Sequence, residues 1–401
     1  MKHNSTLLVF LSVFCIASLF YGWRLWPAVS WRSTNHYTSI KSKMTAILNV
    51  TREQHTTLKP LAKTQLFTTE GPSTRTVTKT FEEYVRHFVK EYTNPYPRGT
   101  KHEKVFEIVR GIANQTWRQS VTNTNAFRRD ILGATRFLDS RRLLYLTRRN
   151  TQVGVNLTFD MNGDPWNVSQ NFWYNLSERT VFEKQKRFKR CSIVGSSGVL
   201  AGSKCGHTID EADFIFRFNL AQVKGHEDDV GTKTNFTTLN PSFVIKQMNT
   251  LGKPEDVTTF ETYLRQFNGS MVWLPAFTTR SYFKFNLRIA DILTDSGIAT
   301  PIFNHPGHFS AVKYLWRRAN YEQNWPSTGL YVVSSAFGLC DEIHLFGFWY
   351  FQKTLEGASI PYHYHNDISF GYKHSRFKEF SNLVHLHKKG ILKMNFGKCK
   401  S

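Results

Sequence analysis

Three segments of the chain before residue 150 carry apolar side chains at helical spacing. The first begins at Phe81, the second at Val105, and the third, which is strongly basic, runs from Phe127 to Arg149. Residues three and four apart share one face of a helix, so each segment predicts a helix that packs against a core. Asn94-Pro-Tyr-Pro97 ends the first helix, because proline disrupts the helical backbone. The apolar positions of the first two segments are Phe81, Tyr84, Val85, Phe88, Val89, Val105, Ile108, Val109 and Ile112.

From Cys191 onward, short apolar runs alternate with segments of helical pattern. This alternation predicts an α/β fold with a largely parallel sheet. Ligands of such sheets bind beyond the carboxyl ends of the strands. Gly195, Asn219 and Trp349 fall at or just past the ends of predicted strands, which makes them candidate site residues. The predicted strands are Ser192–Val194, Phe214–Phe218, Met271–Leu274 and Ile343–Phe346, and a helix is predicted over Leu330–Leu339.

The N-terminus carries an uncharged run, Ser5 to Trp23, that is long enough to cross a bilayer, which takes roughly twenty apolar residues. A cleaved signal peptide is the alternative, but the run is long for one and no clear cleavage site follows it. Because nearly all of the chain follows this run, we expect a type II membrane anchor with the C-terminal bulk in the lumen. The predicted organisation is a cytoplasmic tail over 1–6, a transmembrane signal anchor over 7–23, a Thr-, Ser- and Lys-rich stem over 24–80 and a folded lumenal domain over 81–401.

Asn-x-Ser/Thr sequons beyond the predicted anchor agree with a lumenal location. The 401 residues carry a formal net charge of +22. Such a charge often indicates nucleic-acid binding, but the anchor and the sequons argue against that class of partner. A basic lumenal protein meets other polyanions, namely sialylated glycans, nucleotide sugars or acidic lipids. The asparagines predicted to be glycosylated are Asn49, Asn114, Asn156, Asn167, Asn175, Asn235 and Asn268.

Two motifs far apart in the sequence each have features of an anion site. Cys191-Ser-Ile-Val-Gly-Ser-Ser-Gly198 is a buried strand that breaks into a glycine turn. Pro326-Ser-Thr-Gly329 is a helix start, where free N–H groups and the helix dipole favour a phosphate or carboxylate. Neither motif is specific alone, because glycine turns and N-caps also occur without ligands. A bond between Cys191 and Cys340 would hold the two motifs side by side, and it would require an oxidising compartment.

Together with two later motifs, these segments resemble the four sialylmotifs of animal sialyltransferases. The large motif corresponds to residues 191–235 and the small motif to residues 326–349. His363-Tyr-His-Asn366 resembles the third motif, and His374-Ser-Arg-Phe-Lys-Glu379 resembles the fourth. Asn240-Pro-Ser242, the second cysteine pair and Leu345-Phe-Gly-Phe-Trp349 are most similar to the α2,8-sialyltransferase branch.

The resemblance implies a Golgi type II enzyme that transfers sialic acid from CMP-sialic acid to a sialylated glycoprotein or glycolipid, with inversion. It implies a single Rossmann-like catalytic domain over 81–401, a GT-A-like variant with a mostly parallel sheet flanked by helices. His374 is implied as the general base that takes the proton of the acceptor hydroxyl, a role that suits an imidazole near pH 7. His363 is implied as a contact of the leaving donor phosphate. The implied donor-binding residues are Ser196, Asn219, Ser327, Thr328, Gly329 and Trp349.

The chain departs from the family pattern at two places. Ser196 stands where asparagine is usual, and the third motif continues with His365 and Asn366 where an aromatic and an acidic residue are usual. A serine can still hydrogen-bond the donor, but it has a shorter reach and no amide group. These changes bear on donor binding and acceptor preference rather than on the class of reaction.

Five cysteines are present, of which Cys15 lies in the predicted anchor. The other four allow three pairings, and the resemblance selects Cys191–Cys340 and Cys205–Cys399. No metal or other cofactor is expected, because a CMP-sugar carries one phosphate and the chain has no Asp-x-Asp motif. We interpret the nearest acidic cluster, Glu227-Asp-Asp229, as a solvated loop.

The sequence leaves two alternative functions open. One is a sialyltransferase of another linkage, and the other is a catalytically weak, membrane-anchored protein that binds sialoglycans. The number of sialic acids added is also open. Polymerising relatives carry a basic stretch just before the first motif, whereas here the run from Lys184 to Arg190 is short and follows Glu183.

Overall fold

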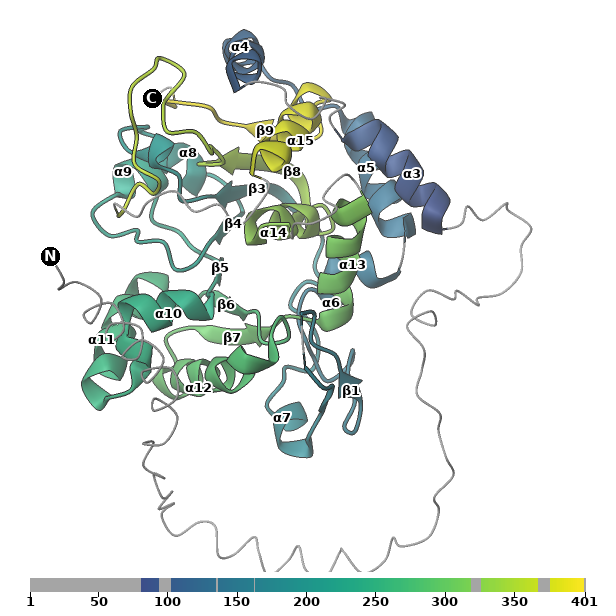
Figure 1. Cartoon of the computed structure of the whole chain (residues 1–401), viewed down its shortest axis with the longest axis vertical. Coiled ribbons are helices and arrows are strands. Elements are labelled where there is room, and N and C mark those ends of the chain that lie inside the picture. The colour runs from purple at the N-terminus through teal and green to yellow at the C-terminus, as the bar shows by residue number, and fades with distance from the viewer. Residues whose placement is uncertain are drawn as a thin grey trace, which may run out of the picture. The chain divides into compact units, whose positions relative to one another are not determined.

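Seven parallel strands form the central sheet, in the order β7-β6-β5-β4-β3-β8-β9 (Figure 1). Each neighbouring pair is parallel, and β3 and β8 form the longest ladder. The predicted α/β fold with a largely parallel sheet is therefore confirmed. The strands are β3 (Phe188–Val194), β4 (Phe214–Arg217), β5 (Phe236–Thr238), β6 (Met271–Leu274), β7 (Thr300–Phe303), β8 (Cys340–Phe346) and β9 (Lys393–Met394).

The computed structural model describes residues 81–93, 102–134, 136–161, 163–318, 326–366 and 376–399. The predicted tail, anchor and stem, with Cys15 and Asn49, lie outside these residues. Within the described ranges, no helix is both long and apolar enough to cross a membrane.

Helices cover both faces of the sheet, and the side chains of each strand alternate between the two layers. On β3, Cys191 and Ile193 belong to one core and Val194 belongs to the opposite one. Helices on the first face are α3 (Phe81–Tyr92), α4 (His102–Ala113), α5 (Val121–Ala134), α13 (Pro306–Arg318), α14 (Thr328–Ala336) and α15 (Arg376–Lys388). Helices on the second face are α8 (Gly206–Asp210), α9 (Glu227–Val230), α10 (Pro241–Gln247), α11 (Pro254–Leu264) and α12 (Arg280–Ser296).

Short elements connect the helices and strands of the two layers. They are β1 (Asn156–Leu157), β2 (Trp166–Asn167), α6 (Ser140–Leu143), α7 (Gln170–Tyr174), η2 (Arg136–Leu138), η3 (Gly198–Leu200), η4 (Asn249–Leu251) and η5 (Arg265–Phe267).

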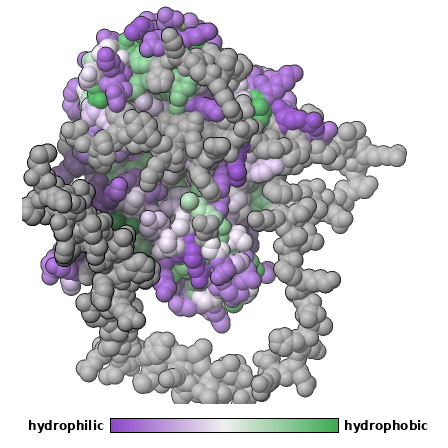
Figure 2. Space-filling model, viewed as in Figure 1, coloured by the Kyte–Doolittle hydropathy of each residue, from purple (hydrophilic) through white to green (hydrophobic). Residues whose placement is uncertain are grey.

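On the face of the molecule in Figure 2, hydrophilic residues predominate and hydrophobic residues form small patches.

The prediction of one helix over Phe127–Arg149 is wrong. The structure has α5, then η2, then α6, because the Asp139 carboxylate caps a new helix by accepting the Arg141 backbone N–H at 3.1 Å. The predicted helix Leu330–Leu339 is α14, which ends earlier, at Ala336, so that Cys340 already begins β8. The helices predicted at Phe81 and Val105 are confirmed as α3 and α4.

Candidate functional site

A cavity of about 260 Å³ opens at the carboxyl ends of the central strands. Its walls come from the residues that follow β3, β4, β5 and β8, from the start of α14 and from the loop before α15. This volume lies near the lower limit for ligand pockets. The fold thereby brings together one set of predicted site residues, namely Ser196, Asn219, Ser327, Thr328, Gly329, Trp349 and His363.

The turn after β3 forms the first wall, and glycine is required there. A Cβ at Gly195 would lie 2.5 Å from the backbone oxygen of Gly347, the residue that follows β8. The two turns therefore approach more closely than any side chain allows. Ser196 follows, and its carbonyl accepts the Tyr364 N–H at 3.0 Å. Its hydroxyl makes no hydrogen bond to any described residue, so it is available to a ligand in the cavity.

The start of α14 forms the second wall. Ser327 is the N-cap, and its Oγ accepts the Leu330 N–H at 3.1 Å. The buried Glu379 carboxylate, from α15, accepts the Ser327 N–H at 2.7 Å and the Ser327 hydroxyl at 2.5 Å. Glu379 therefore already occupies the first donor of this helix start. The N–H groups of Thr328 and Gly329 donate to no acceptor among the described residues and remain for an anion.

Asn219 holds the wall between β4 and β5. Its φ is +53°, in the left-handed region that asparagine tolerates better than most residues. Its N–H donates to the Thr238 hydroxyl at 3.0 Å, and its Oδ1 accepts the Asn240 N–H at 3.0 Å. Within the described part of the chain, its Nδ2 makes no hydrogen bond. The side chain thus both fixes the wall and leaves one amide group for a ligand.

The segment His363–Asn366 closes the cavity beside the first wall. Ser197 and His363 form an isolated bridge, which places this segment against the glycine turn. His363 Nδ1 lies 2.9 Å from Asn366 Oδ1, and Asn366 Nδ2 lies 3.1 Å from His365 Nδ1. Burial, followed by the charges of His363 and His226, lowers the pKa of His365 to about 4. His365 is therefore neutral near pH 7. The side-chain amide of Asn366 is within hydrogen-bond distance of both imidazoles, those of His363 and His365.

Trp349 lines the cavity, but it is mainly a core residue. It is 3% exposed, and its ring packs against Phe106, Phe351 and Phe380. Its indole N–H donates to the Lys353 backbone at 2.8 Å. Little of this ring remains for a nucleotide.

Two further outcomes concern the sequence predictions for the site. The predicted base, His374, lies outside the described residues. The sequence prediction did not assign several lining residues to the site, because a pattern does not show which side chains at a strand end, on a helix or in a loop face a cavity. They are Phe218, Thr238, Asn240, Phe243, Gln247, Phe348, Tyr350 and Tyr362.

Comparison with known proteins gives the cavity its context. Residues 145–391 match the profile of glycosyltransferase family 29 (sialyltransferase). This chain belongs to that family. The chain is 35% identical over 309 residues to an alpha-N-acetylneuraminide alpha-2,8-sialyltransferase of Xenopus tropicalis, with 74% of this chain and 85% of that protein covered. It is 32% identical over 300 residues to the Bos taurus protein of the same name, with 73% and 82% covered. A crystal structure of a mammalian sialyltransferase matches with 19% identity and a TM-score of 0.39, covering 80% of this chain and 99% of that one.

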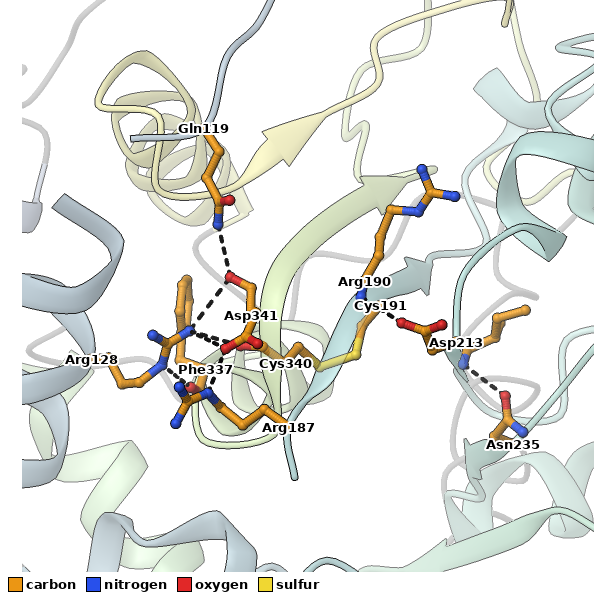
Figure 3. Close-up of a disulfide and its surroundings, with 11 residues drawn as sticks. Gln119, Arg128, Arg187, Arg190, Cys191, Asp213, Asn235, Phe337, Cys340 and Asp341 are labelled. Carbon is orange, nitrogen blue, oxygen red and sulfur yellow. Dashed lines mark hydrogen bonds and ion pairs between the residues drawn. A yellow bond between two sulfur atoms is a disulfide. The ribbon is translucent and has the colours of Figure 1, made fainter. Parts of the chain in front are cut away.

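Both predicted disulfides are present in this sialyltransferase, but the first lies away from the cavity. Cys191 and Cys340 join β3 to β8, with Cα atoms 6.0 Å apart (Figure 3). Cys191 precedes the Gly195 turn by four residues, roughly 13 Å of strand. The bond therefore joins the strands that lead to the walls and does not clamp the walls themselves. Cys205 and Cys399 tie the C-terminus to the segment before α8, with Cα atoms 4.9 Å apart.

Other predictions for this sialyltransferase concern its surface. The Glu227–Asp229 cluster is not a loop but the start of α9, where the Asp229 carboxylate accepts the N–H groups of Gly202 and Lys204 at 2.7 and 2.8 Å. Across the described ranges, no group of three or more His, Cys, Asp or Glu side chains is placed to hold a metal ion. The sequon asparagines within those ranges are all exposed: Asn114, Asn156, Asn167, Asn175, Asn235 and Asn268.

Proposed function

We propose that this enzyme transfers sialic acid from CMP-sialic acid to a glycan that already ends in sialic acid, forming an α2,8 linkage with inversion. The observation that carries the proposal is the convergence of six separate chain segments on one cavity beyond the strand ends. The relatives named alpha-2,8-sialyltransferases support the linkage.

The cavity offers donors suited to a single phosphate. The N–H groups of Thr328 and Gly329 lie at the positive end of α14, where a negative charge is stabilised. The hydroxyl of Ser196, in the first wall, and the amide of Asn219, in the wall between β4 and β5, supply further donors. Such fixed dipoles stabilise the charge that develops on the leaving phosphate, as a preorganised site does.

The reaction itself is a single displacement. The acceptor hydroxyl oxygen attacks the anomeric carbon of the donor sugar while the bond to the CMP phosphate breaks, and CMP leaves with the bonding electron pair. Attack from the face opposite the leaving group inverts the configuration. His374 takes the proton of the hydroxyl, and His363 contacts the departing phosphate.

We further propose that the reaction needs no metal or other cofactor, because only one phosphate charge has to be stabilised. EDTA should leave the rate unchanged, and a strict requirement for a divalent metal would contradict this. We also propose a Golgi location, with the chain anchored by residues 7–23 and the catalytic domain in the lumen. Trimming by endoglycosidase of the full-length chain expressed in cells tests the lumenal orientation.

The transfer reaction is tested with the purified full-length chain, CMP-sialic acid and acceptors that end in sialic acid, both glycoprotein and glycolipid. We expect an α2,8-linked product, with its linkage and length read by NMR and mass spectrometry. His374→Ala should lower the rate by about 100-fold or more, the contribution of a general base. His207→Ala is the matched control, because its side chain is 89% exposed on α8 and does not line the cavity. Transfer that survives His374→Ala would exclude this base, and donor binding without turnover would favour a sialoglycan-binding protein.

A further inference from the structure

A second cavity, of about 960 Å³, lies at the starts of β3 and β8, whereas the first cavity lies at their carboxyl ends. It is formed by α5, η2, α6, the loop that follows α6, the loops that precede β3 and β8, and His305, which follows β7. Arg187 and Gly338, which line it, come directly before β3 and β8. We call it the arginine cavity, after its six arginines: Arg128, Arg136, Arg141, Arg142, Arg149 and Arg187.

The arginine cavity is separate from the sialyltransferase site. β3 begins beside Arg187 and ends at the Gly195 turn, with seven residues between the two cavities. At about 3.3 Å per residue, this strand spans roughly 23 Å. A ligand in one cavity therefore does not reach the reacting atoms in the other.

The arginine cavity has an excess of positive charge. Asp139 and Glu183 are the only carboxylates in its lining, so the six arginines leave a net charge of +4 (6 − 2). Three of the arginines make hydrogen bonds or ion pairs within the fold. Arg128 donates to the Phe337 and Cys340 carbonyls, both at 2.8 Å, and Arg187 pairs with Asp341 at 2.6 Å (Figure 3). Arg141 donates to the carbonyls of Phe182, Glu183 and Gln185.

The remaining arginines are weakly paired. Arg142 is 69% exposed, and its Nε lies 3.9 Å from Asp139, whose carboxylate also caps α6. Arg136 forms no ion pair with any described residue; its guanidinium lies 5.2 Å from the centre of the Phe137 ring. Arg149 lies 3.3 Å from Glu183 and 3.8 Å from Glu178, and its side chain is 53% exposed. Surface pairs of this kind stabilise by at most about 1 kcal/mol, so they exchange easily for a stronger anion.

The lining identifies the chemistry of the ligand. Guanidinium groups bind phosphate and carboxylate oxygens in a bidentate manner. Among the described residues of the lining, Phe137 is the only Phe, Tyr or Trp, and the Arg136 guanidinium already covers its ring, whereas the first cavity is lined by six Phe, Tyr and Trp rings. The arginine cavity thus offers charge without a ring on which a sugar could stack. We propose that the arginine cavity binds a small soluble ligand that carries a multiply charged phosphate.

A membrane lipid could present the same phosphate chemistry, but the surface here does not favour it. Membrane binding needs apolar side chains that enter the lipid as well as basic ones. Leu132, at 39% exposed, is the one residue of this lining among the strongly exposed large apolar side chains. The concave arrangement of the arginines also suits a ligand that enters the cavity.

Calorimetric titration of the purified full-length chain with inorganic pyrophosphate tests the proposal. Wild-type protein should bind with a saturable isotherm that weakens steeply as salt is raised. Arg136→Gln combined with Arg142→Gln should weaken binding at least tenfold, without a change in melting temperature, because neither side chain holds the fold together. Arg265→Gln combined with Arg288→Gln removes the same charge from exposed positions outside the cavity and should change the affinity less than twofold.

Three results would overturn the proposal. The first is equal loss of affinity in the control pair, which would reduce the effect to net charge. The second is loss of pyrophosphate binding in the Ser196→Ala, Thr328→Ala variant, which would place binding in the first cavity. The third is a protein that does not bind pyrophosphate but binds phosphoinositide-containing vesicles or sialyllactose. The ligand of the arginine cavity would then be a lipid or a sugar carboxylate instead of a soluble phosphate.

Discussion

The contact between Glu379 and Ser327 joins α15 to the start of α14, and these two helices belong to different motifs. A substitution of either residue alone removes hydrogen bonds from this contact. Glu379→Gln keeps the shape of the side chain but replaces one acceptor oxygen by an NH₂ group. That group faces either the Ser327 N–H, which can only donate, or the Ser327 hydroxyl, which would have to accept from it and give up its own bond to the carboxylate; these atoms now lie 2.7 and 2.5 Å from the carboxylate. Glu379 is 0% exposed, so water does not replace the lost acceptor.

The expected cost follows from these bonds. A hydrogen bond to a charged group contributes about 1.5–3 kcal/mol, so Glu379→Gln should lower the free energy of unfolding by about that amount. Ser327→Ala loses the hydroxyl bond to Glu379 and the N-cap bond to Leu330, and should cost about 1–2 kcal/mol. Because the two variants remove one shared bond, the double variant should cost about 1 kcal/mol less than the sum of the single ones.

Urea unfolding of the four proteins with disulfides intact, followed by tryptophan fluorescence, measures this coupling. Donor binding gives a second readout, since the N–H groups of Thr328 and Gly329 follow Ser327 directly. Ser327→Ala, which removes the N-cap and leaves the charge of Glu379 unchanged, should weaken CMP-sialic acid binding by several-fold even at temperatures where the variant is fully folded. Costs that add to within about 0.5 kcal/mol would refute the coupling.

Three further predictions test other parts of the structure. Gly195→Ala should abolish donor binding and cost about 1–3 kcal/mol, because its Cβ would meet the Gly347 oxygen, whereas Gly111→Ala, with nothing within 4 Å of its Cβ, should stabilise α4 slightly; both are measured by unfolding and donor titration. Burial lowers the pKa of His308 to about 3. Below about pH 6.5 the imidazole is therefore protonated in the unfolded chain but stays neutral in the folded chain. Stability should therefore fall by about 2 kcal/mol per such histidine between pH 7 and pH 5, and His308→Gln should flatten the decline measured by urea unfolding at these two pH values. Cys399→Ser should cost about 2–5 kcal/mol of stability, and peptide mapping without reductant should recover Cys191–Cys340; a Cys191–Cys205 peptide would contradict the structure.

Local patterns in the sequence predicted the layered fold well. The helices α3 and α4 were predicted from apolar side chains at helical spacing, and the strand β6 was predicted from its continuous apolar run. The strands β5 and β9 were not predicted, because they are only three and two residues long. The strand β7 was not predicted, because it begins with Thr300-Pro301 and proline interrupts a strand pattern. The basic segment from Phe127 was predicted as one helix, since periodicity continues across the capping residue Asp139, whose role depends on its local hydrogen bond.

The candidate site was predicted from motifs rather than from periodicity. Those motifs identified residues that do line one cavity, including Ser196, Thr328 and His363. What the sequence could not show is which donors are already used. Glu379 lies 52 residues from Ser327, and only the packing of α15 on α14 reveals that its carboxylate occupies the helix start. The arginine cavity was not predicted either. Five of its arginines lie in the segment Phe127–Arg149, which was predicted as one helix, and Arg187 lies in the short basic run before β3.

The affinity for CMP-sialic acid of the Ser196→Ala, Thr328→Ala double variant tests the central claim most directly. Neither hydroxyl makes a hydrogen bond to a described residue, so their removal leaves the bonds that hold these residues together intact. Each lost hydrogen bond to the donor costs about 0.5–1.5 kcal/mol. The account predicts an unchanged free energy of unfolding and a dissociation constant raised about 10-fold. An unchanged dissociation constant in the folded variant would contradict the assignment of this cavity as the donor site.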